Sequence, residues 1–184
     1  PRCWRRWRCW RWKLLARANR SDGRHGCHAE RYPFPCDLEI HYALGAEGFS
    51  FKAIVRNTGT QVLPFHIGWH PYFKVQRNWG LTPEPTVRLI KNEFSYPGEE
   101  IPYAGHEWAE EVDGAFFYSD NPRICNDEYT LEIKKLAPIV QIFRPANAPF
   151  IAVEPVTGLG HPDFPWIEVP PGQYREIRTA ITLV

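Results

Sequence analysis

The sequence contains no methionine, and its first residue is Pro1 instead of an initiator residue. We therefore interpret the chain as a processed product, a fragment, or a reading that starts away from its natural beginning. Long hydrophobic runs are also missing, because no stretch approaches the roughly 18 uninterrupted apolar residues that a membrane-spanning helix needs. This absence predicts that the chain does not cross a membrane with a helix.

Cysteine is scarce and shows no pairing pattern. The five cysteines are odd in number and form no CxxC motif: Cys3, Cys9, Cys27, Cys36 and Cys125. This predicts reduced thiols in a cytoplasmic protein, without a disulfide framework or a zinc pattern. His25, Cys27 and His28 lie close together, but no further ligands follow at a definite spacing. We therefore expect no metal.

Aromatic residues, prolines and glycines are abundant by comparison. An aromatic fraction of 15% beside a charged fraction of 23% argues against wholesale disorder, because so much aromatic surface must be buried. Eighteen prolines and 13 glycines favour short strands joined by many turns over a helix bundle. No segment sustains a 3.6-residue period for three turns, although residues 107–112 could form one helical turn.

The net charge of +1 hides a division of the chain. Residues 1–24 hold nine basic residues and one acidic residue, whereas the other 160 residues hold 13 basic and 20 acidic residues. The segment PRCWRRWRCWRWKLL combines arginine with tryptophan, as in peptides that bind nucleic acids or membrane surfaces. Neither residue type keeps to one helical face, and the features of a secretory signal or transit peptide are missing.

The alternative interpretation is that this segment results from translating a GC-rich DNA sequence in the wrong reading frame or past its true start. We adopt this alternative, and we expect residues 1–31 to be disordered or not native and residues 32–184 to form the domain. Nucleic-acid binding through the basic tail ranks last among the candidate functions. It would require an affinity that falls steeply with salt.

From Tyr32 onward the pattern is that of β-structure. Apolar and polar residues alternate in residues 38–44 and 49–55, and the turn residues GAEG between them indicate a hairpin. Other stretches typical of strands are residues 62–67, 86–90, 129–135, 139–143, 150–153 and 176–183. The segments between them are rich in proline, glycine, asparagine and aspartate. The prediction is an all-β antiparallel sandwich.

Two segments are unusual for plain strand packing: PFHIGWHPYF (residues 64–73) and FIAVEPVTG (residues 150–158). Glu154 follows four apolar residues and precedes a proline, so we expect its carboxylate where a buried strand emerges. His70 also precedes a proline, which restricts its backbone to extended conformations. Trp69 could offer a flat apolar surface to a sugar ring, as could Tyr72 and Phe73.

A glutamate and a histidine together suit a reaction that removes one proton and adds another. A carboxylate in a partly apolar site has a raised proton affinity and can act as a base, and a histidine can deliver a proton near neutrality. A structural interpretation stays open for both. A glutamate at a strand end is often solvated, and a histidine beside aromatic residues often serves packing.

Four segments, in order, resemble the aldose 1-epimerase (galactose mutarotase) family: YPFPCDLEIHYAL, GFSFKAIVRNTG, PFHIGWHPYF and PFIAVEPVTG. The resemblance runs from Tyr32 to the end of the chain. It implies an antiparallel β-supersandwich enzyme that interconverts the α and β anomers of aldoses without a cofactor. By position in the motifs, Glu154 would take the proton from the C1 hydroxyl and His70 would protonate the ring oxygen.

The resemblance also implies that Asp113 binds sugar hydroxyls, although a VDG turn is common and a plain turn aspartate is the alternative. The expected partner is a free hexose such as galactose or glucose, with phosphorylated sugars as a further possibility.

Family members are longer, and their N-terminal half carries further strands, an arginine and another histidine. We treat the match of His25-Gly26 to a family His-Gly motif as chance. We expect an incomplete family member, and the competing hypothesis is a sugar-binding relative without turnover. The oligomeric state is not predicted.

Overall fold

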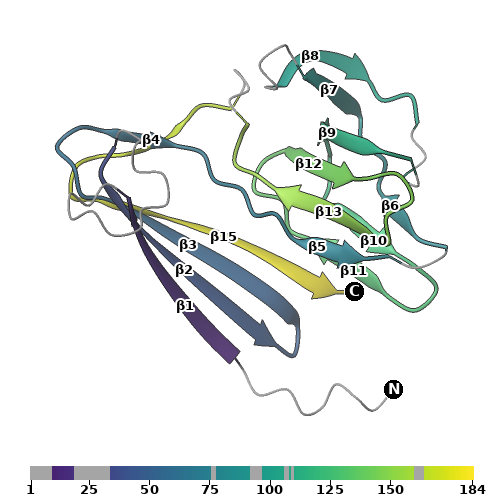
Figure 1. Cartoon of the computed structure of the whole chain (residues 1–184), viewed down its shortest axis with the longest axis horizontal. Coiled ribbons are helices and arrows are strands. Elements are labelled where there is room, and N and C mark those ends of the chain that lie inside the picture. Colours follow the sequence, from purple (N-terminus) through teal and green to yellow (C-terminus); the bar gives the residue numbers. More distant parts are fainter. Residues whose placement is uncertain are drawn as a thin grey trace. The chain divides into compact units, whose positions relative to one another are not determined.

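The computed structural model describes residues 10–18, 34–75, 78–91, 97–105, 108, 110–159 and 164–184 (Figure 1). Within these ranges every regular element is a β-strand, and every strand pairing is antiparallel. No helix in this part of the chain is long and apolar enough to cross a membrane. The predicted all-β, antiparallel fold class is confirmed.

The chain forms two compact units. The first comprises Pro1–Phe65 and Ile167–Ala180, and the second comprises His66–Trp166 and Ile181–Val184. Strand β15 (Tyr174–Leu183) contributes residues to both units.

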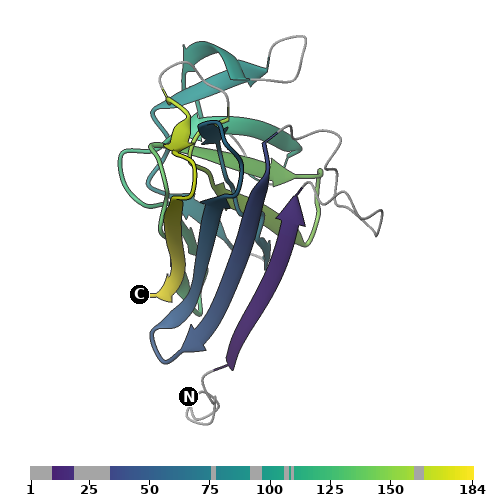
Figure 2. The same ribbon diagram turned by 90° about the vertical axis from the view of Figure 1, so that its left-hand side faces the viewer.

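The first unit is built on the predicted hairpin. Strands β2 (Cys36–Gly45) and β3 (Gly48–Asn57) pair over their full lengths, from Cys36 opposite Asn57 to Gly45 opposite Gly48. Gly48 has a φ of 135°, a backbone conformation that side chains rarely allow. Figure 2 shows β1 (Trp10–Ala18), β2 and β3 as neighbouring ribbons. A two-stranded sheet of β4 (Leu63–Phe65) and β14 (Ile167–Val169) completes this unit.

Asn57 ties the irregular parts of the first unit together. Its side chain is 1% exposed, and its Nδ2 donates hydrogen bonds to the carbonyl oxygens of Gln61 and Val169, both at 2.7 Å. Its Oδ1 accepts the backbone N–H of Gly59 at 2.9 Å. A buried amide pays its desolvation cost only when such bonds are made, so Asn57 holds the loop after β3 against β14.

The second unit contains a six-stranded sheet in the order β5-β13-β12-β9-β7-β8. Its strands are β5 (Tyr72–Lys74), β13 (Phe150–Pro155), β12 (Ile139–Arg144), β9 (Val112–Phe117), β7 (Val87–Lys91) and β8 (Pro97–Pro102). Among the shorter strands, β10 (Arg123–Cys125) pairs with both β6 (Gly80–Thr82) and β11 (Thr130–Ile133), and β11 also pairs with the end of β15.

One face of the six-stranded sheet is buried in a core. The core side chains of this sheet pack with Leu81, Ile124 and Ile133 from the three shorter strands. They come from alternate positions of the sheet strands: Phe73, Val112, Phe116, Val140, Ile142, Ile151 and Val153. Because strand side chains alternate between faces, the residues between these positions point to the opposite face of the sheet.

Several strand predictions differ from the structure in extent. The predicted strand 62–67 is only three residues long, as β4, whereas the strand predicted to end at residue 153 continues through Glu154 and Pro155. Val112 begins strand β9 instead of ending a helical turn, and part of 107–112 lies outside the described residues. The unpredicted short strands β5, β6, β10 and β14 hold only three residues each, too few to show an alternating pattern.

The N-terminal segment contains one strand that was not expected. Strand β1 pairs with β2 over nine residues, from Trp10 opposite Leu44 to Ala18 opposite Cys36. Residues 1–9 and 19–33 lie outside the described residues, and they include the candidate metal ligands His25, Cys27 and His28. The separate character of residues 1–31 stays a prediction.

Candidate active site

The two segments singled out in the sequence lie side by side in the second unit. Strand β5 pairs with β13, with Tyr72 opposite Ala152. The antiparallel register continues beyond β5, where Gly68 forms a β-bridge with Val156. Two backbone hydrogen bonds flank this bridge: Trp69 N donates to Pro155 O at 3.1 Å, and Thr157 N donates to Ile67 O at 2.9 Å. Residues 67–74 and 150–157 are therefore two neighbouring segments of the chain that run antiparallel.

This register sets His70 opposite Glu154. Because the adjacent pair, Trp69 and Pro155, is joined by a backbone hydrogen bond, the pair of His70 and Glu154 is a non-hydrogen-bonded one. Side chains are closest in such pairs, where the Cα atoms are typically about 4.5 Å apart. Extended backbone at His70, enforced by Pro71, keeps the residue in this pairing.

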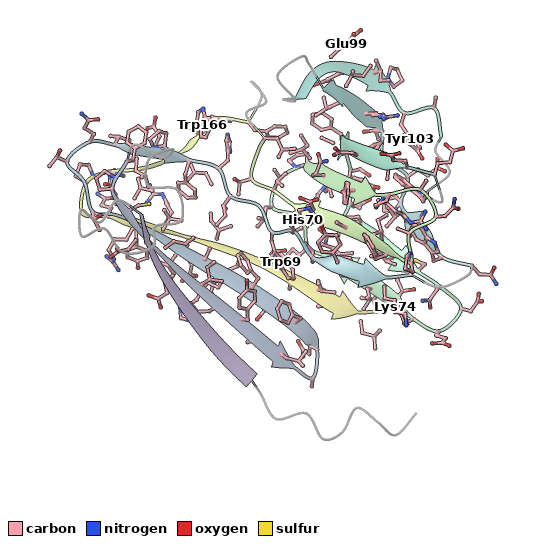
Figure 3. All side chains as sticks on the ribbon, viewed as in Figure 1. Trp69, His70, Lys74, Glu99, Tyr103 and Trp166 are labelled. Carbon is pink, nitrogen blue, oxygen red and sulfur yellow. The ribbon has the colours of Figure 1, made fainter. Side chains whose placement is uncertain are left out.

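The side chains of His70 and Glu154 are in direct contact. His70 Nε2 lies 3.0 Å from Glu154 Oε1, and the side chains are 48% and 12% exposed, respectively. Glu154 lies on the sheet face opposite the core, since its neighbour Val153 belongs to the core. The structure thus joins a nearly buried carboxylate to a half-exposed imidazole that solvent can reach (Figure 3 labels His70).

Aromatic rings surround the imidazole. The Tyr72 ring stacks on His70 with centroids 4.7 Å apart, and Phe143 meets His70 edge-on at 6.3 Å. Phe150 contacts Tyr72 edge-on at 5.4 Å. Tyr72 is 59% exposed, so an apolar surface next to His70 and Glu154 stays accessible. Trp69 is half-buried, and its backbone N–H serves the register described above.

Asp113 lies on the same sheet face and accepts a hydrogen bond from Gln141, a residue that the sequence pattern did not single out. Gln141 on β12 is opposite Glu154 on β13, and its Nε2 donates to Asp113 Oδ1 at 2.8 Å. Asp113 is opposite Phe143 in the register of β9 and β12. The three polar side chains Glu154, Gln141 and Asp113 thus lie on one face of three neighbouring strands, with Asp113 diagonal to Gln141. A polar residue between the core residues Val140 and Ile142 was the available signal.

A second polar feature of this unit lies apart from the His70 contact. A hollow of about 330 Å³ is lined by Thr82, Pro83, Asp120, Asn121, Arg123 and Glu132. Here Arg123 donates two hydrogen bonds to Glu132 Oε2, and Asn121 donates one to Glu132 Oε1. Hydrogen bonds from Arg123 and then Asn121 lower the pKa of Glu132. That carboxylate is held in its ionised form and is a poor candidate for proton transfer.

Metal ligands do not gather in the described ranges. No group of three or more histidine, cysteine, aspartate or glutamate side chains there could hold a metal ion. The chemistry that the geometry offers is proton exchange between His70, Glu154 and a bound molecule.

Sequence and structure comparisons relate the chain to one protein family and to solved structures of one fold. The family model for aldose 1-epimerase matches residues 15–113, more than half of the chain. The match begins inside strand β1, earlier than the expected start at Tyr32, and it ends at Asp113, before Glu154. A search of curated proteins found no match.

Solved structures with the same fold include a galactose mutarotase-like protein from Lactobacillus casei, with a TM-score of 0.76 at 20% identity. A galactose mutarotase-like protein from Clostridium acetobutylicum has a TM-score of 0.78 at 11% identity, and a candidate aldose 1-epimerase from Escherichia coli K12 has 0.76 at 18%. These matches cover 95%, 96% and 95% of this chain, but 70%, 63% and 65% of the respective structures. The chain therefore spans about two thirds of their length.

Proposed function

Since this chain belongs to the aldose 1-epimerase family, we propose that it interconverts the α and β anomers of a free hexose by acid–base ring opening. The observation that carries the proposal is the contact of His70 Nε2 with Glu154 Oε1, in which the His70 side chain is 48% exposed. The reaction needs one group that takes a proton and one that gives a proton, within reach of neighbouring sugar oxygens.

In the proposed mechanism, binding of the sugar replaces the direct contact between His70 and Glu154. Glu154 then contacts the anomeric oxygen, and His70 contacts the ring oxygen. Glu154 removes the proton from the C1 hydroxyl while His70, in its protonated form, protonates the ring oxygen. The C1–O5 bond breaks and the aldehyde forms, leaving Glu154 protonated and His70 neutral. Rotation about C1–C2 and reversal of both proton transfers close the ring as the other anomer.

The neighbouring side chains supply binding and orientation. Asp113 and the Gln141 amide, already hydrogen-bonded to each other at 2.8 Å, offer an acceptor and a donor for ring hydroxyls. Tyr72 offers a flat apolar surface to the face of the sugar, whereas Trp69, next to His70 in the extended segment, points to the opposite sheet face. Galactose and glucose are the proposed substrates, and their phosphorylated forms are the alternative.

The test is the anomerisation of freshly dissolved α-D-galactose and α-D-glucose, followed by polarimetry against the spontaneous rate. We expect the chain to accelerate the change, and Glu154→Gln and His70→Ala each to lower kcat by about 10²–10⁴-fold, the usual contribution of a positioned acid or base. Glu132→Gln is the matched control, because Glu132 is a carboxylate of the same unit paired with Arg123 instead of a histidine. α-D-Glucose 6-phosphate in a parallel arm tests the alternative substrate.

A rate equal to that of buffer, from protein shown to be folded by circular dichroism, would contradict the catalytic proposal. Calorimetric titration with galactose would then decide between the remaining possibilities. Heat of binding without acceleration would support a sugar-binding relative that lacks turnover.

A further inference from the structure

The backbone ladder beside His70 is weakened by two prolines. Pro71 and Pro155 have no N–H group, so neither can donate a hydrogen bond between residues 67–74 and 150–157. The two prolines flank the pair of His70 and Glu154, and β5 itself contributes only three residues of regular pairing. The register of these two segments at the proposed active site therefore depends strongly on the hydrogen bonds at one end, between Ile67 and Thr157.

At that end a side chain replaces a backbone acceptor. Ile67 N donates to the hydroxyl Oγ1 of Thr157 at 2.9 Å, while Thr157 N donates to Ile67 O at 2.9 Å. Thr157 thus engages both backbone hydrogen-bonding groups of Ile67, three residues before His70.

The Thr157 hydroxyl is itself held in place by His66. Its Oγ1 lies 3.5 Å from His66 Nδ1, and a hydroxyl that accepts from Ile67 has its own hydrogen available for that nitrogen. The His66 ring contacts Trp166 with centroids 4.2 Å apart, and it lies so close to Gly158 that a methyl group there would collide with it. Burial lowers the pKa of His66, which favours the neutral ring that can accept at Nδ1.

We propose that Thr157 is a positioning residue for the acid–base pair: its hydroxyl, held between Ile67 N–H and His66, sets the register that keeps His70 opposite Glu154. This inference rests on the proposed function and assigns a role to the threonine and glycine that follow Glu154-Pro155. Gly158 leaves room for the His66 ring, and Thr157 transmits the position of that ring to the backbone before His70.

The first test compares Thr157→Val, which keeps the shape and removes the hydroxyl, with Thr157→Ser, which keeps the hydroxyl. We expect Thr157→Val to lower kcat by about 10–100-fold, because small misplacements of a catalytic group have effects of this size. KM should change less than kcat, since the sugar-binding groups Asp113 and Gln141 lie on other strands. Thr157→Ser should retain kcat within about threefold.

A double-mutant cycle distinguishes positioning from general damage to the fold. In a His70→Ala background, Thr157→Val should change the residual kcat by less than about twofold, because the group that it positions is gone. The proposal would be overturned if Thr157→Val lowered kcat by the same factor with and without His70. It would also be overturned if Thr157→Ser lowered kcat as much as Thr157→Val.

A spectroscopic test is independent of turnover. In protein with isotope-labelled histidine, nuclear Overhauser effects from the His70 ring to Glu154 and Tyr72 should be present in the wild type and in Thr157→Ser, and weakened or lost in Thr157→Val. If the wild type does not accelerate anomerisation, the proposed function fails, and these contacts still decide the positioning role. Unchanged contacts in a folded Thr157→Val protein would contradict it.

Discussion

Asn57 in the first unit and Glu154 in the second are both buried polar side chains near the ends of long strands. Asn57 directs its donor and acceptor atoms to backbone groups of Gln61, Val169 and Gly59. Glu154 instead contacts the half-exposed side chain of His70.

The difference shows how burial can serve structure or chemistry. A neutral amide bonded to backbone holds loops in one arrangement and cannot exchange protons near neutrality. A carboxylate beside an accessible imidazole can pass a proton to or from a bound molecule. Substitutions should therefore affect stability at Asn57 and catalysis at Glu154, and the following predictions test that division.

The largest expected effect is the loss of activity in Glu154→Gln. A kcat lower by about 10²–10⁴-fold corresponds to about 3–5 kcal/mol in the activation barrier, whereas the free energy of unfolding should change by no more than about 1 kcal/mol. The small change is expected because the partner His70 is half-exposed and solvent weakens the pair. Polarimetry and urea denaturation measure the two quantities. A variant that unfolds readily would show that Glu154 is structural.

Asn57→Ala should have the opposite effect, with a large loss of stability and little change in kcat. Truncation leaves the carbonyl oxygens of Gln61 and Val169 and the N–H of Gly59 without their present partner, which should lower the free energy of unfolding by about 3 kcal/mol. The kcat per folded molecule should stay within about twofold of the wild type. Urea denaturation followed by tryptophan fluorescence gives the first value. A loss below about 1 kcal/mol would mean that water replaces these bonds.

Gly158→Ala should have an intermediate effect on stability, because the added methyl group would collide with the His66 ring. Overpacking of this kind typically lowers the free energy of unfolding by about 1–3 kcal/mol. Gly80→Ala is the matched control in the same unit, since nothing lies within 4 Å of its added methyl group. Equal thermal midpoints for the two variants would show that the His66 ring can move aside without loss.

The smallest expected effect is a pH dependence from His66. Burial lowers its pKa in the folded state below the ordinary value of 6.5, so the unfolded chain binds the proton more readily. Its contribution to stability is thus fully present above about pH 6.5 and declines as the pH falls toward the lowered pKa. Urea midpoints between pH 8 and pH 5 should fall more steeply for the wild type than for His66→Gln. Parallel curves would rule out this contribution.

Part of this molecule could be predicted from local pattern alone. The alternation in residues 38–44 and 49–55 matches the β2–β3 hairpin, because one face of each strand is apolar and a short turn joins them. The segments that hold His70 and Glu154 stood out because charged and aromatic residues interrupt apolar runs beside prolines. Their roles in proton transfer stay predictions that the experiments above address.

Other features could not be read from the pattern. Gln141 looked like an ordinary polar residue of a strand, and its place between Glu154 and Asp113 depends on which strands flank β12. Thr157 lies within the segment FIAVEPVTG, but the sequence suggested no role for it, and its hydrogen bond to Ile67 spans 90 residues of sequence.

The sequence by itself determined the all-β class, the alternating faces of the hairpin strands β2 and β3, and which side chain types could exchange protons, because these depend on side-chain chemistry and a two-residue period. Only the tertiary structure decided that His70 lies opposite Glu154. The register between these distant segments depends on their backbone pairing, which the two prolines weaken, and on the hydrogen bond to the Thr157 hydroxyl at its end.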